Sequence, residues 1–369
     1  MLLIKEGNLF GNVTDILCQG KTIIEIGNIN YKLLKKIFQN QEIEIVYANN
    51  MKIIPSYIDN HVHIIGGGGE NGFSSRIPEM DVNDILKHGV TTVVGVLGTD
   101  TTTKTVDTLV AKTKALNEEG ITAYCLTGGY EFPSPTLTGR IQKDIAFINE
   151  IIGLKTAISD HRCYNPNTDD LIKMISEVRV AALISNKPGI VNIHIGYGKG
   201  NMDKLLNIIE ETNIPIKHIF PTHVSKTDTI MEQAIKMTNM GGYVDVTTNK
   251  PNDELADKIK YMSTKGNESL ITISSDANGS CPIWENSIYR GMTISNMSGI
   301  HQLIKYLIIN CNYPIEKAIS FATTNPANLL QLNKKGKIAL NYDADMLILD
   351  KDYEINTVIS KGKIRGKRR

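Results

Sequence analysis

The segment Ile53-Ile-Pro-Ser-Tyr-Ile-Asp-Asn-His61-Val-His63 places two histidines directly after an apolar run. The run Ile53–Ile58 is rich in the β-branched residues that favour a buried strand. Residues two apart in an extended chain face the same side, so His61 and His63 can point together toward one site. Neutral imidazole is a common zinc ligand, and two imidazoles on one strand form half of a metal site. The alternative is a pair of ordinary surface or core histidines.

Outward from this segment, strand-like and helix-like patterns alternate through the middle of the chain. Further strands are expected at Thr92–Leu97, Ile121–Leu126, Leu154–Ile158, Ile190–His194, His218–Thr222, Tyr243–Val246 and Leu270–Ser274. Most of them are separated by helical patterns, at Val106–Glu119, Ile145–Ile152, Asp169–Ser185, Met202–Thr212, Thr229–Met240 and Asp253–Lys265. Eight strands with intervening helices fit a closed (β/α)8 TIM barrel. A doubly wound open sheet is the alternative, and the polar residues after the strands favour the barrel.

Three of these polar residues resemble the first histidine pair in their placement. His194 ends one expected strand, His223 follows another, and Asp276 follows the last. Barrel active sites are built at the C-terminal ends of the strands, so these side chains should meet His61 and His63 in one site. Three other histidines lack this placement and are interpreted as structural or surface residues: His88, His218 and His301.

Lys155 lies among apolar neighbours in the expected strand Gly153-Leu-Lys-Thr-Ala-Ile-Ser159. Burying an ammonium group is costly, and a buried lysine loses its proton readily. A neutral amine can add carbon dioxide to form a carbamate, an anion whose two oxygens could bridge two metal ions. The alternative is a lysine whose head reaches solvent.

Both ends of the chain are rich in short strand-like segments. They occur at Leu2–Ile4, Thr22–Ile26 and Ile43–Val46, and again at Gly336–Leu340 and Asp345–Asp350. Two β-rich ends that flank an α/β middle predict one discontinuous β-sandwich domain of residues 1–52 plus 335–369. The barrel domain would then take residues 53–334.

The bulk composition argues against several classes of function. Lys+Arg 40 against Asp+Glu 39 gives a net charge of +1, so no overall field attracts nucleic acid or an acidic membrane. The basic end Lys361–Arg369 contains no aromatic residues and is interpreted as a solvated tail. The 5 cysteines form no CxxC pair, which argues against a disulfide framework. A charged start and the lack of a long apolar run predict a cytoplasmic protein without a membrane segment.

Together these residues resemble the amidohydrolase superfamily. His61-Val-His63 marks only the superfamily, whereas four longer strings are similar to isoaspartyl dipeptidases. They are His61-Val-His-Ile-Ile-Gly66-Gly-Gly-Gly-Glu70, Gly95-Val-Leu-Gly-Thr-Asp100, Leu126-Thr-Gly-Gly-Tyr130 and Ala157-Ile-Ser-Asp-His-Arg162. The resemblance covers essentially the whole chain. It implies hydrolysis of the isopeptide bond of β-aspartyl dipeptides, with release of aspartate.

The resemblance also implies a site with two Zn(2+) ions per chain. His61 and His63 would bind the more buried zinc, with Asp276 completing its site. His194 and His223 would bind the second zinc, and carboxylated Lys155 would bridge the pair. The family's substrate-binding positions correspond here to Glu70, Thr99, Tyr130, Arg162, Lys226 and Ser280. The resemblance implies a catalytic role as well for Glu70 and Tyr130, beside Asp276. Family members form large homo-oligomers, so the resemblance implies a homo-oligomer, with an octamer expected.

Lys226 departs from the family pattern, which has arginine three residues after the last histidine ligand. Lysine keeps the positive charge but lacks the planar, two-pronged hydrogen-bonding geometry of arginine. The departure puts the affinity for a substrate carboxylate, and with it the preferred substrate, in question.

The implied mechanism starts from a hydroxide shared by the two zinc ions, which attacks the amide carbonyl. Asp276 would accept the hydroxide proton and deliver it to the leaving amine. The Tyr130 hydroxyl would stabilise the developing oxyanion. The dipeptide carries one ammonium group and at least two carboxylates at neutral pH. Glu70 suits the ammonium group, and Arg162 with Lys226 suits the carboxylates.

Simpler roles stay open for several of these residues. The run Gly66–Gly69 could be a flexible lid, Tyr130 a packed aromatic, and Arg162 the ion-pair partner of Asp160 or His161. A dihydroorotase-like, hydantoinase-like or N-acylamino-acid-deacylase-like enzyme would share the metals. A non-catalytic barrel would be expected to lose metal ligands, whereas all six candidate positions here hold competent residues.

Overall fold

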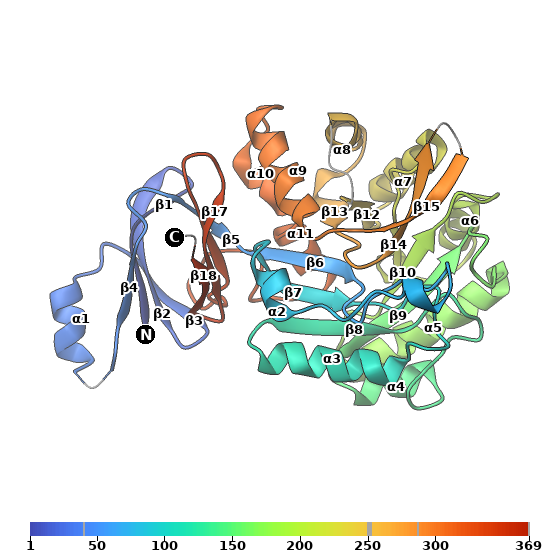
Figure 1. Ribbon diagram of the computed structural model, residues 1–369, viewed down its shortest axis with the longest axis horizontal. Helices are drawn as coiled ribbons and strands as arrows, with labels where there is room; N and C mark the ends of the chain where they lie inside the picture. Colours follow the sequence, from blue (N-terminus) through green and yellow to red (C-terminus); the bar gives the residue numbers. More distant parts are fainter. Residues whose placement is uncertain (40, 249–252, 286–287, 368–369) are drawn as a thin grey trace.

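The computed structural model describes residues 1–39, 41–248, 253–285 and 288–367. A barrel with surrounding helices lies beside a second sheet that combines strands from both ends of the chain (Figure 1). Two arginines of the expected basic tail, Arg368 and Arg369, lie outside the described residues. Within the described residues, no helix has the length and apolar character needed to cross a membrane.

The barrel is a sheet of 8 strands in the order β13-β12-β11-β10-β9-β8-β7-β6. The strands are β6 (Tyr57–Val62), β7 (Val90–Gly95), β8 (Thr122–Gly128), β9 (Ile151–Ile158), β10 (Ile190–Ile195), β11 (Ile219–Thr222), β12 (Val244–Thr247) and β13 (Ile271–Ser274). All paired neighbours along it are parallel. Its two edges meet where Asp276 N donates to His61 O at 3.1 Å and His63 N donates to Ala277 O at 2.9 Å. The (β/α)8 prediction is confirmed.

Helices connect and cover the barrel strands (Figure 1). They are α2 (Val82–Leu86), α3 (Val106–Glu118), α4 (Ile141–Phe147), α5 (Thr168–Ser185), α6 (Asp203–Glu211), α7 (Asp228–Asn239), α8 (Asp253–Lys265), α9 (Ser298–Ile309), α10 (Ile315–Ser320) and α11 (Thr324–Leu329). Helix α5 shows why they form. Asn167 and Asp170 make a reciprocal capping box at its start, and Leu171, Ile175 and Val178 repeat at helical spacing on its buried face.

The terminal sheet also has 8 strands and combines both ends of the chain. Its strands are β1 (Leu2–Leu9), β2 (Asn12–Gln19), β3 (Thr22–Gly27), β4 (Glu44–Tyr47), β5 (Lys52–Pro55), β16 (Met346–Leu349), β17 (Ile355–Ser360) and β18 (Lys363–Lys367). The N-terminal and C-terminal strands share one apolar core, which includes Ile4, Ile16, Met346 and Ile359. Helix α1 (Tyr31–Ile37) lies at the outer end of this part (Figure 1).

Four sequence-based assignments are wrong. Most of the expected solvated tail belongs to the terminal sheet, because Lys363–Lys367 form β18 and pair with β17. The strand expected at Ile53–Ile58 is two strands, because β5 pairs with β16 in the terminal sheet and β6 begins the barrel after Ser56. The mostly apolar run, interrupted only by Ser56, hides this change of sheet. The helix expected at Ile145–Ile152 ends at Phe147, since the β-branched residues from Ile151 enter β9. Gly336–Leu340 forms no strand. Gly336 has φ +77°, and a Cβ atom on it would lie only 2.6 Å from Thr323 O. The chain therefore bends at Gly336 and packs closely against Thr323.

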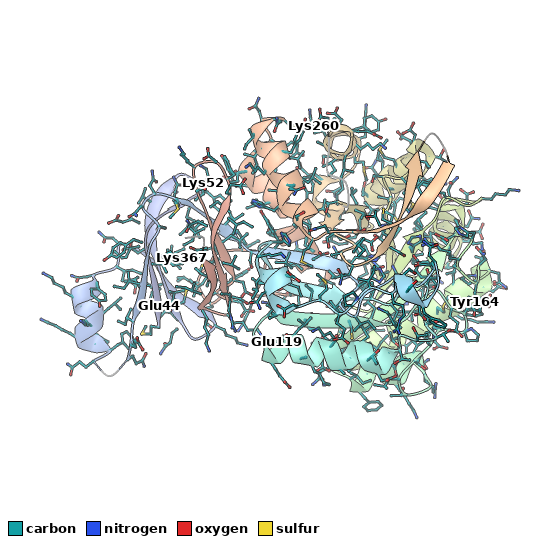
Figure 2. The ribbon with its side chains drawn as sticks, in the orientation of Figure 1. Glu44, Lys52, Glu119, Tyr164, Lys260 and Lys367 are labelled. Atoms are coloured by element: carbon teal, nitrogen blue, oxygen red, sulfur yellow. The ribbon has the colours of Figure 1, made fainter. Side chains whose placement is uncertain are left out.

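The carboxyl ends of the barrel strands point away from the terminal sheet. Tyr164, which follows β9, lies at the opposite end of the molecule from Lys52 of the terminal sheet (Figure 2). Side chains that follow these strands are therefore remote from the terminal sheet. The division into a terminal domain of residues 1–52 plus 335–369 and a barrel domain of residues 53–334 stays a prediction.

Candidate metal and substrate site

Three predicted metal ligands meet at the mouth of the barrel. Single donor atoms of His61, His223 and Asp276 all lie within 4.8 Å of one another, the spacing of a shared cation site. Asp276 Oδ1 is 3.4 Å from His61 Nε2 and 3.2 Å from His63 Nε2. These side chains come from the ends of β6, β11 and β13, and the closure of the barrel brings the first and last strands together.

His194, at the end of β10, completes the group of histidines. Its ring centroid is 4.5 Å from that of His223, which in turn is 5.2 Å from that of His61. Burial, reinforced by nearby lysines, holds the pKa of His61, His194 and His223 well below the usual range. Their rings are therefore neutral near pH 7 and offer lone pairs to a cation.

Two of the ligand candidates sit on strained backbone. His223 has φ +66° and Asp276 has φ +53°, in the left-handed region that non-glycine residues seldom occupy. Glycine is required at position 279 beside the strained Asp276, because a Cβ atom on Gly279 would lie 2.7 Å from Asp276 Oδ1. Strain of this kind is concentrated at functional sites and is held by the surrounding fold.

Lys155 on β9 is completely buried beside these histidines. Its Nζ donates to Asn192 Oδ1 at 2.7 Å and lies 3.4 Å from His61 Nε2. Among the described residues no carboxylate oxygen lies within 4.0 Å of this Nζ. Burial lowers the pKa of Lys155 to about 7, so a large fraction of the amine is neutral at physiological pH. The alternative of a head group that reaches solvent is wrong.

Five of the six substrate candidates line one pocket beside the histidines, whereas Lys226 is not among the described residues that line it. Its lining includes Glu70, Thr99, Tyr130, Arg162 and Ser280, together with His63, His194 and Asp276. Ser280, at the start of β14 (Ser280–Glu285), donates from Oγ to Glu70 Oε1 at 2.5 Å. Arg162 Nη1 lies 3.5 Å from the same oxygen. An anion and a cation therefore face one pocket.

Arg162 forms an ion pair with Asp160, the alternative role that the sequence analysis left open, and it also lines the pocket. Its Nε and Nη2 donate to the two carboxylate oxygens of Asp160 at 3.0 and 2.9 Å. Asp160 Oδ2 lies 2.9 Å from His194 Nε2 as well. Asp160 therefore joins a substrate candidate to a metal-ligand candidate.

Tyr130 packs against both groups. Its ring centroid lies 4.9 Å from that of His194, and the guanidinium carbon of Arg162 is 5.7 Å from the ring. Burial raises the pKa of the Tyr130 phenol well above its usual value. The hydroxyl therefore stays protonated and can act as a hydrogen-bond donor toward the pocket.

Lys226 lies beside His194. Its Nζ donates to Ile195 O at 2.7 Å, is 3.4 Å from His194 Nε2 and lies 5.0 Å from the centre of the Tyr197 ring. Burial lowers the pKa of Lys226 to about 8. The ammonium group is thus next to the histidines, where a ligand carboxylate would find a positive charge.

The glycine run after His63 is hydrogen-bonded to two neighbouring segments of the chain. Gly67 N donates to Asn278 O at 2.7 Å, and Gly67 O accepts from Ile77 N at 3.1 Å. Gly66 has φ +75° and approaches Ile77 so closely that a Cβ atom would lie 2.1 Å from its carbonyl oxygen. Beneath the run, Lys104 Nζ donates to the carbonyls of Ile65, Gly66 and Ile77 at 2.6, 2.6 and 2.9 Å. The loop that carries Glu70 is therefore anchored.

Sequence reasoning missed Asp160, Asn192 and Lys104. Asp160 follows the strand β9 just as the ligand candidates follow theirs, so its position was a usable signal. Nothing in the sequence marks Asn192 or Lys104, whose roles depend on which groups the fold places beside them. Two of the histidines set aside have structural partners: His218 Nδ1 lies 2.7 Å from Gly189 O, and His301 Nδ1 lies 2.9 Å from the Tyr57 hydroxyl.

Comparison with known proteins assigns the chain to one enzyme family. Residues 53–365 match the model of the amidohydrolase family. A crystal structure of β-aspartyl dipeptidase from Fervidobacterium islandicum AW-1, in complex with β-Asp-Leu dipeptide, is 38% identical, with a TM-score of 0.91. It aligns over 99% of this chain and 97% of that chain. A second structure of β-aspartyl dipeptidase from that organism is 37% identical over the same shares, with a TM-score of 0.90.

A more distant match is imidazolonepropionase from Clostridium tetani, 27% identical over 192 residues, which are 47% of this chain and 45% of the relative. The chain spans less than half the length of the curated relatives it matches. The full-length match to the Fervidobacterium structures is therefore the more informative one. The chain belongs to the amidohydrolase family and, within it, to the β-aspartyl dipeptidases.

Proposed function

We propose that this protein hydrolyses the isopeptide bond of β-aspartyl dipeptides and releases free aspartate. The substrate carries an ammonium group, at least two carboxylates and one amide bond between them. The observation that carries the proposal is the pairing in one pocket of Glu70 and Arg162, 3.5 Å apart, above the His61, His223 and Asp276 group. A zwitterionic substrate needs both charges beside the reacting centre.

The donor set fits zinc. Histidine nitrogen and carboxylate oxygen are ordinary zinc ligands, and the rings of His61, His194 and His223 are neutral. The Nδ1 atoms of His61 and His63 are buried and have no hydrogen-bond partner among the described residues. We assign His61, His63 and Asp276 to one zinc and His194 and His223 to a second. Lys155 as its carbamate would bridge the two, since it is buried beside His61 and its amine is easily deprotonated.

Bound zinc lowers the pKa of water to about 7 and polarises the substrate carbonyl. Asp276 accepts the proton of the attacking water and passes it to the leaving amine, because it lines the pocket and contacts the histidine group. The Tyr130 hydroxyl donates to the carbonyl oxygen as negative charge develops there. Its raised pKa keeps the donor proton in place.

The remaining charges suit the two ends of the dipeptide. The Glu70 carboxylate, held by the Ser280 hydroxyl, receives the substrate ammonium group. Arg162 and Lys226 bind the substrate carboxylates. The ammonium group of Lys226 is a point charge, so it binds a carboxylate with less directional preference than the guanidinium group of Arg162 does. Thr99 completes the pocket wall.

The test is a substrate panel with purified, zinc-loaded protein. We expect release of aspartate from β-aspartyl-leucine and little hydrolysis of α-aspartyl-leucine. The panel includes cyclic ureides, as dihydroorotase or hydantoinase substrates, and N-acylated amino acids. Preference for either class would replace the dipeptidase assignment with another amidohydrolase activity. Zinc-loaded protein that hydrolyses nothing in the panel would favour a non-catalytic barrel.

We also propose a cytoplasmic location and a homo-oligomer, with an octamer expected from resemblance to the family. The domain boundaries proposed are residues 1–52 plus 335–369 for the terminal domain and 53–334 for the barrel. Size-exclusion chromatography with light scattering measures the assembly directly.

A further inference from the structure

Asp160 shares one carboxylate between the substrate pocket and the histidine group. Its Oδ1 accepts from the backbone N–H of Arg162 at 2.9 Å and from Arg162 Nε at 3.0 Å. Its Oδ2 accepts from Arg162 Nη2 at 2.9 Å and lies 2.9 Å from His194 Nε2. The residue is only 6% exposed, so water competes little for these bonds.

The contact with Asp160 determines which nitrogen of the neutral His194 ring carries the proton. An ionised carboxylate can only accept hydrogen bonds, so the proton must lie on Nε2 and point at Asp160 Oδ2. The other nitrogen, Nδ1, then keeps its lone pair. A carboxylate that orients a histidine in this way commonly supports metal binding by the second ring nitrogen.

Lys226 competes for the same histidine nitrogen. Its Nζ lies 3.4 Å from His194 Nε2, and an ammonium group can only donate. If Lys226 were the partner, Nε2 would have to be the acceptor and the proton would move to Nδ1. Asp160 and Lys226 therefore favour opposite tautomers of the ring. The shorter contact is the one with Asp160, which favours the tautomer with the proton on Nε2.

Asp160 also restricts the Arg162 guanidinium group. Two of its nitrogens are held by the carboxylate, and the third, Nη1, lies toward Glu70 Oε1 at 3.5 Å. Only the Nη1 edge is thereby directed at the pocket. A bidentate pair of this kind fixes the plane of a guanidinium group as well as its charge.

We propose that Asp160 is a positioning residue with two tasks. It holds His194 in the tautomer that leaves Nδ1 available as a ligand atom, and it directs Arg162 Nη1 at the substrate. The second task rests on the proposed function. The first concerns only the chain's own side chains and can be measured in metal-free protein.

The first experiment reads the tautomer directly. Long-range ¹H–¹⁵N spectra of metal-free, ¹⁵N-histidine-labelled protein resolve the two ring nitrogens, and His194→Gln identifies the signals of His194. We expect the proton on Nε2 in the wild type. In Asp160→Ala the proton should move to Nδ1, because Lys226 becomes the nearest partner of Nε2. A wild-type ring protonated on Nδ1 would overturn the proposal, and this result needs no variant to fold.

Arg162→Gln and Asp15→Ala are the companion variants. Arg162→Gln removes the guanidinium group but leaves the contact between Asp160 and His194, so the proton should stay on Nε2. Asp15 matches Asp160 in burial, at 5% against 6% exposed, and also accepts from a cation and from backbone N–H groups. It lies in the terminal sheet, so Asp15→Ala should lower stability without changing the His194 signals.

The second experiment measures zinc affinity and steady-state kinetics. By competition with a chelator, Asp160→Ala should weaken zinc binding at one site by about 10- to 100-fold, whereas Arg162→Gln should not. Both variants should raise KM for β-aspartyl-leucine. Unchanged zinc affinity in folded Asp160→Ala would remove the first task. If the wild type shows the expected tautomer but no dipeptidase activity, the proposed function fails while the assignment of Asp160 to His194 stands.

Discussion

Asp276 Oδ1 lies 3.2 Å from His63 Nε2, so the carboxylate that follows the last barrel strand touches a histidine that follows the first. The contact exists because the barrel closes between these two segments, where His63 N donates to Ala277 O. One carboxylate is thereby placed among the metal-ligand candidates and in the lining of the pocket. This position is what qualifies it to move a proton.

Asp276→Asn should abolish turnover while substrate binding stays measurable. The amide cannot take up a proton, and loss of general acid–base catalysis alone costs about 10²- to 10⁴-fold in rate. Release of aspartate measures kcat, calorimetry measures binding, and metal analysis of the variant separates loss of zinc from loss of the proton carrier. Near-normal turnover in this variant would make the proton-shuttle role of Asp276 wrong.

Tyr130→Phe should lower kcat by about 10²-fold or more, because removing one oxyanion donor has effects of that size. The ring remains, so its packing against His194 should be kept and thermal stability should change little. An unchanged kcat would mean that Tyr130 is only a packed aromatic residue of the pocket, which is the alternative role that the sequence analysis gave it.

Lys226→Met should raise KM by about 10- to 100-fold, since a hydrogen bond to a charged group contributes about 1.5–3 kcal/mol. Methionine keeps most of the length of the side chain but removes the charge next to His194. Lys226→Arg is the conservative partner and should retain most of the affinity. Equal KM values for wild type and Lys226→Met would exclude this residue from carboxylate binding.

Lys104→Met should lower the free energy of unfolding by about 1–3 kcal/mol and raise KM. It leaves three buried carbonyls of the loop that carries Glu70 without their donor. Lys187 supplies a matched control, because its Nζ also donates to three carbonyls, those of Ile145, Ile148 and Ile151. Lys187→Met should lose similar stability with an unchanged KM. A raised KM in both variants would mean that general loosening, not the loop anchor, is responsible.

Stability should fall in acid partly through Asp15. Burial acts to raise its pKa, but hydrogen bonds from Lys5, Glu6 N and Ile29 N outweigh it and hold the pKa below the usual value. The unfolded chain therefore binds a proton at a higher pH than the folded chain does. The stabilisation is complete above about pH 4 and is lost as the pH falls through the folded pKa.

Urea unfolding of wild type and Asp15→Asn at several pH values checks this. Asp15→Asn should be less stable at pH 7, and the difference should shrink below about pH 4. A constant difference across that range would show that Asp15 contributes through packing alone.

The barrel and most of the candidate site could be predicted from the order of residues along the chain. The alternation of apolar strands with amphipathic helices requires layers of helix on a parallel sheet, and polar residues after the strands mark the end where a site forms. His61, His63, His194, His223 and Asp276 were found in this way because local order along each strand sets the direction of its side chains.

How these residues meet depends on contacts between segments that are far apart in the chain. The break at Ser56 depends on β5 pairing with β16, a contact with the far end of the chain. The anchoring of the glycine run by Lys104 and the sharing of Asp160 between Arg162 and His194 likewise join separate segments. Hydrogen bonds and tautomers depend on distances of a few ångströms between such segments, and a pattern along one strand carries no information about them.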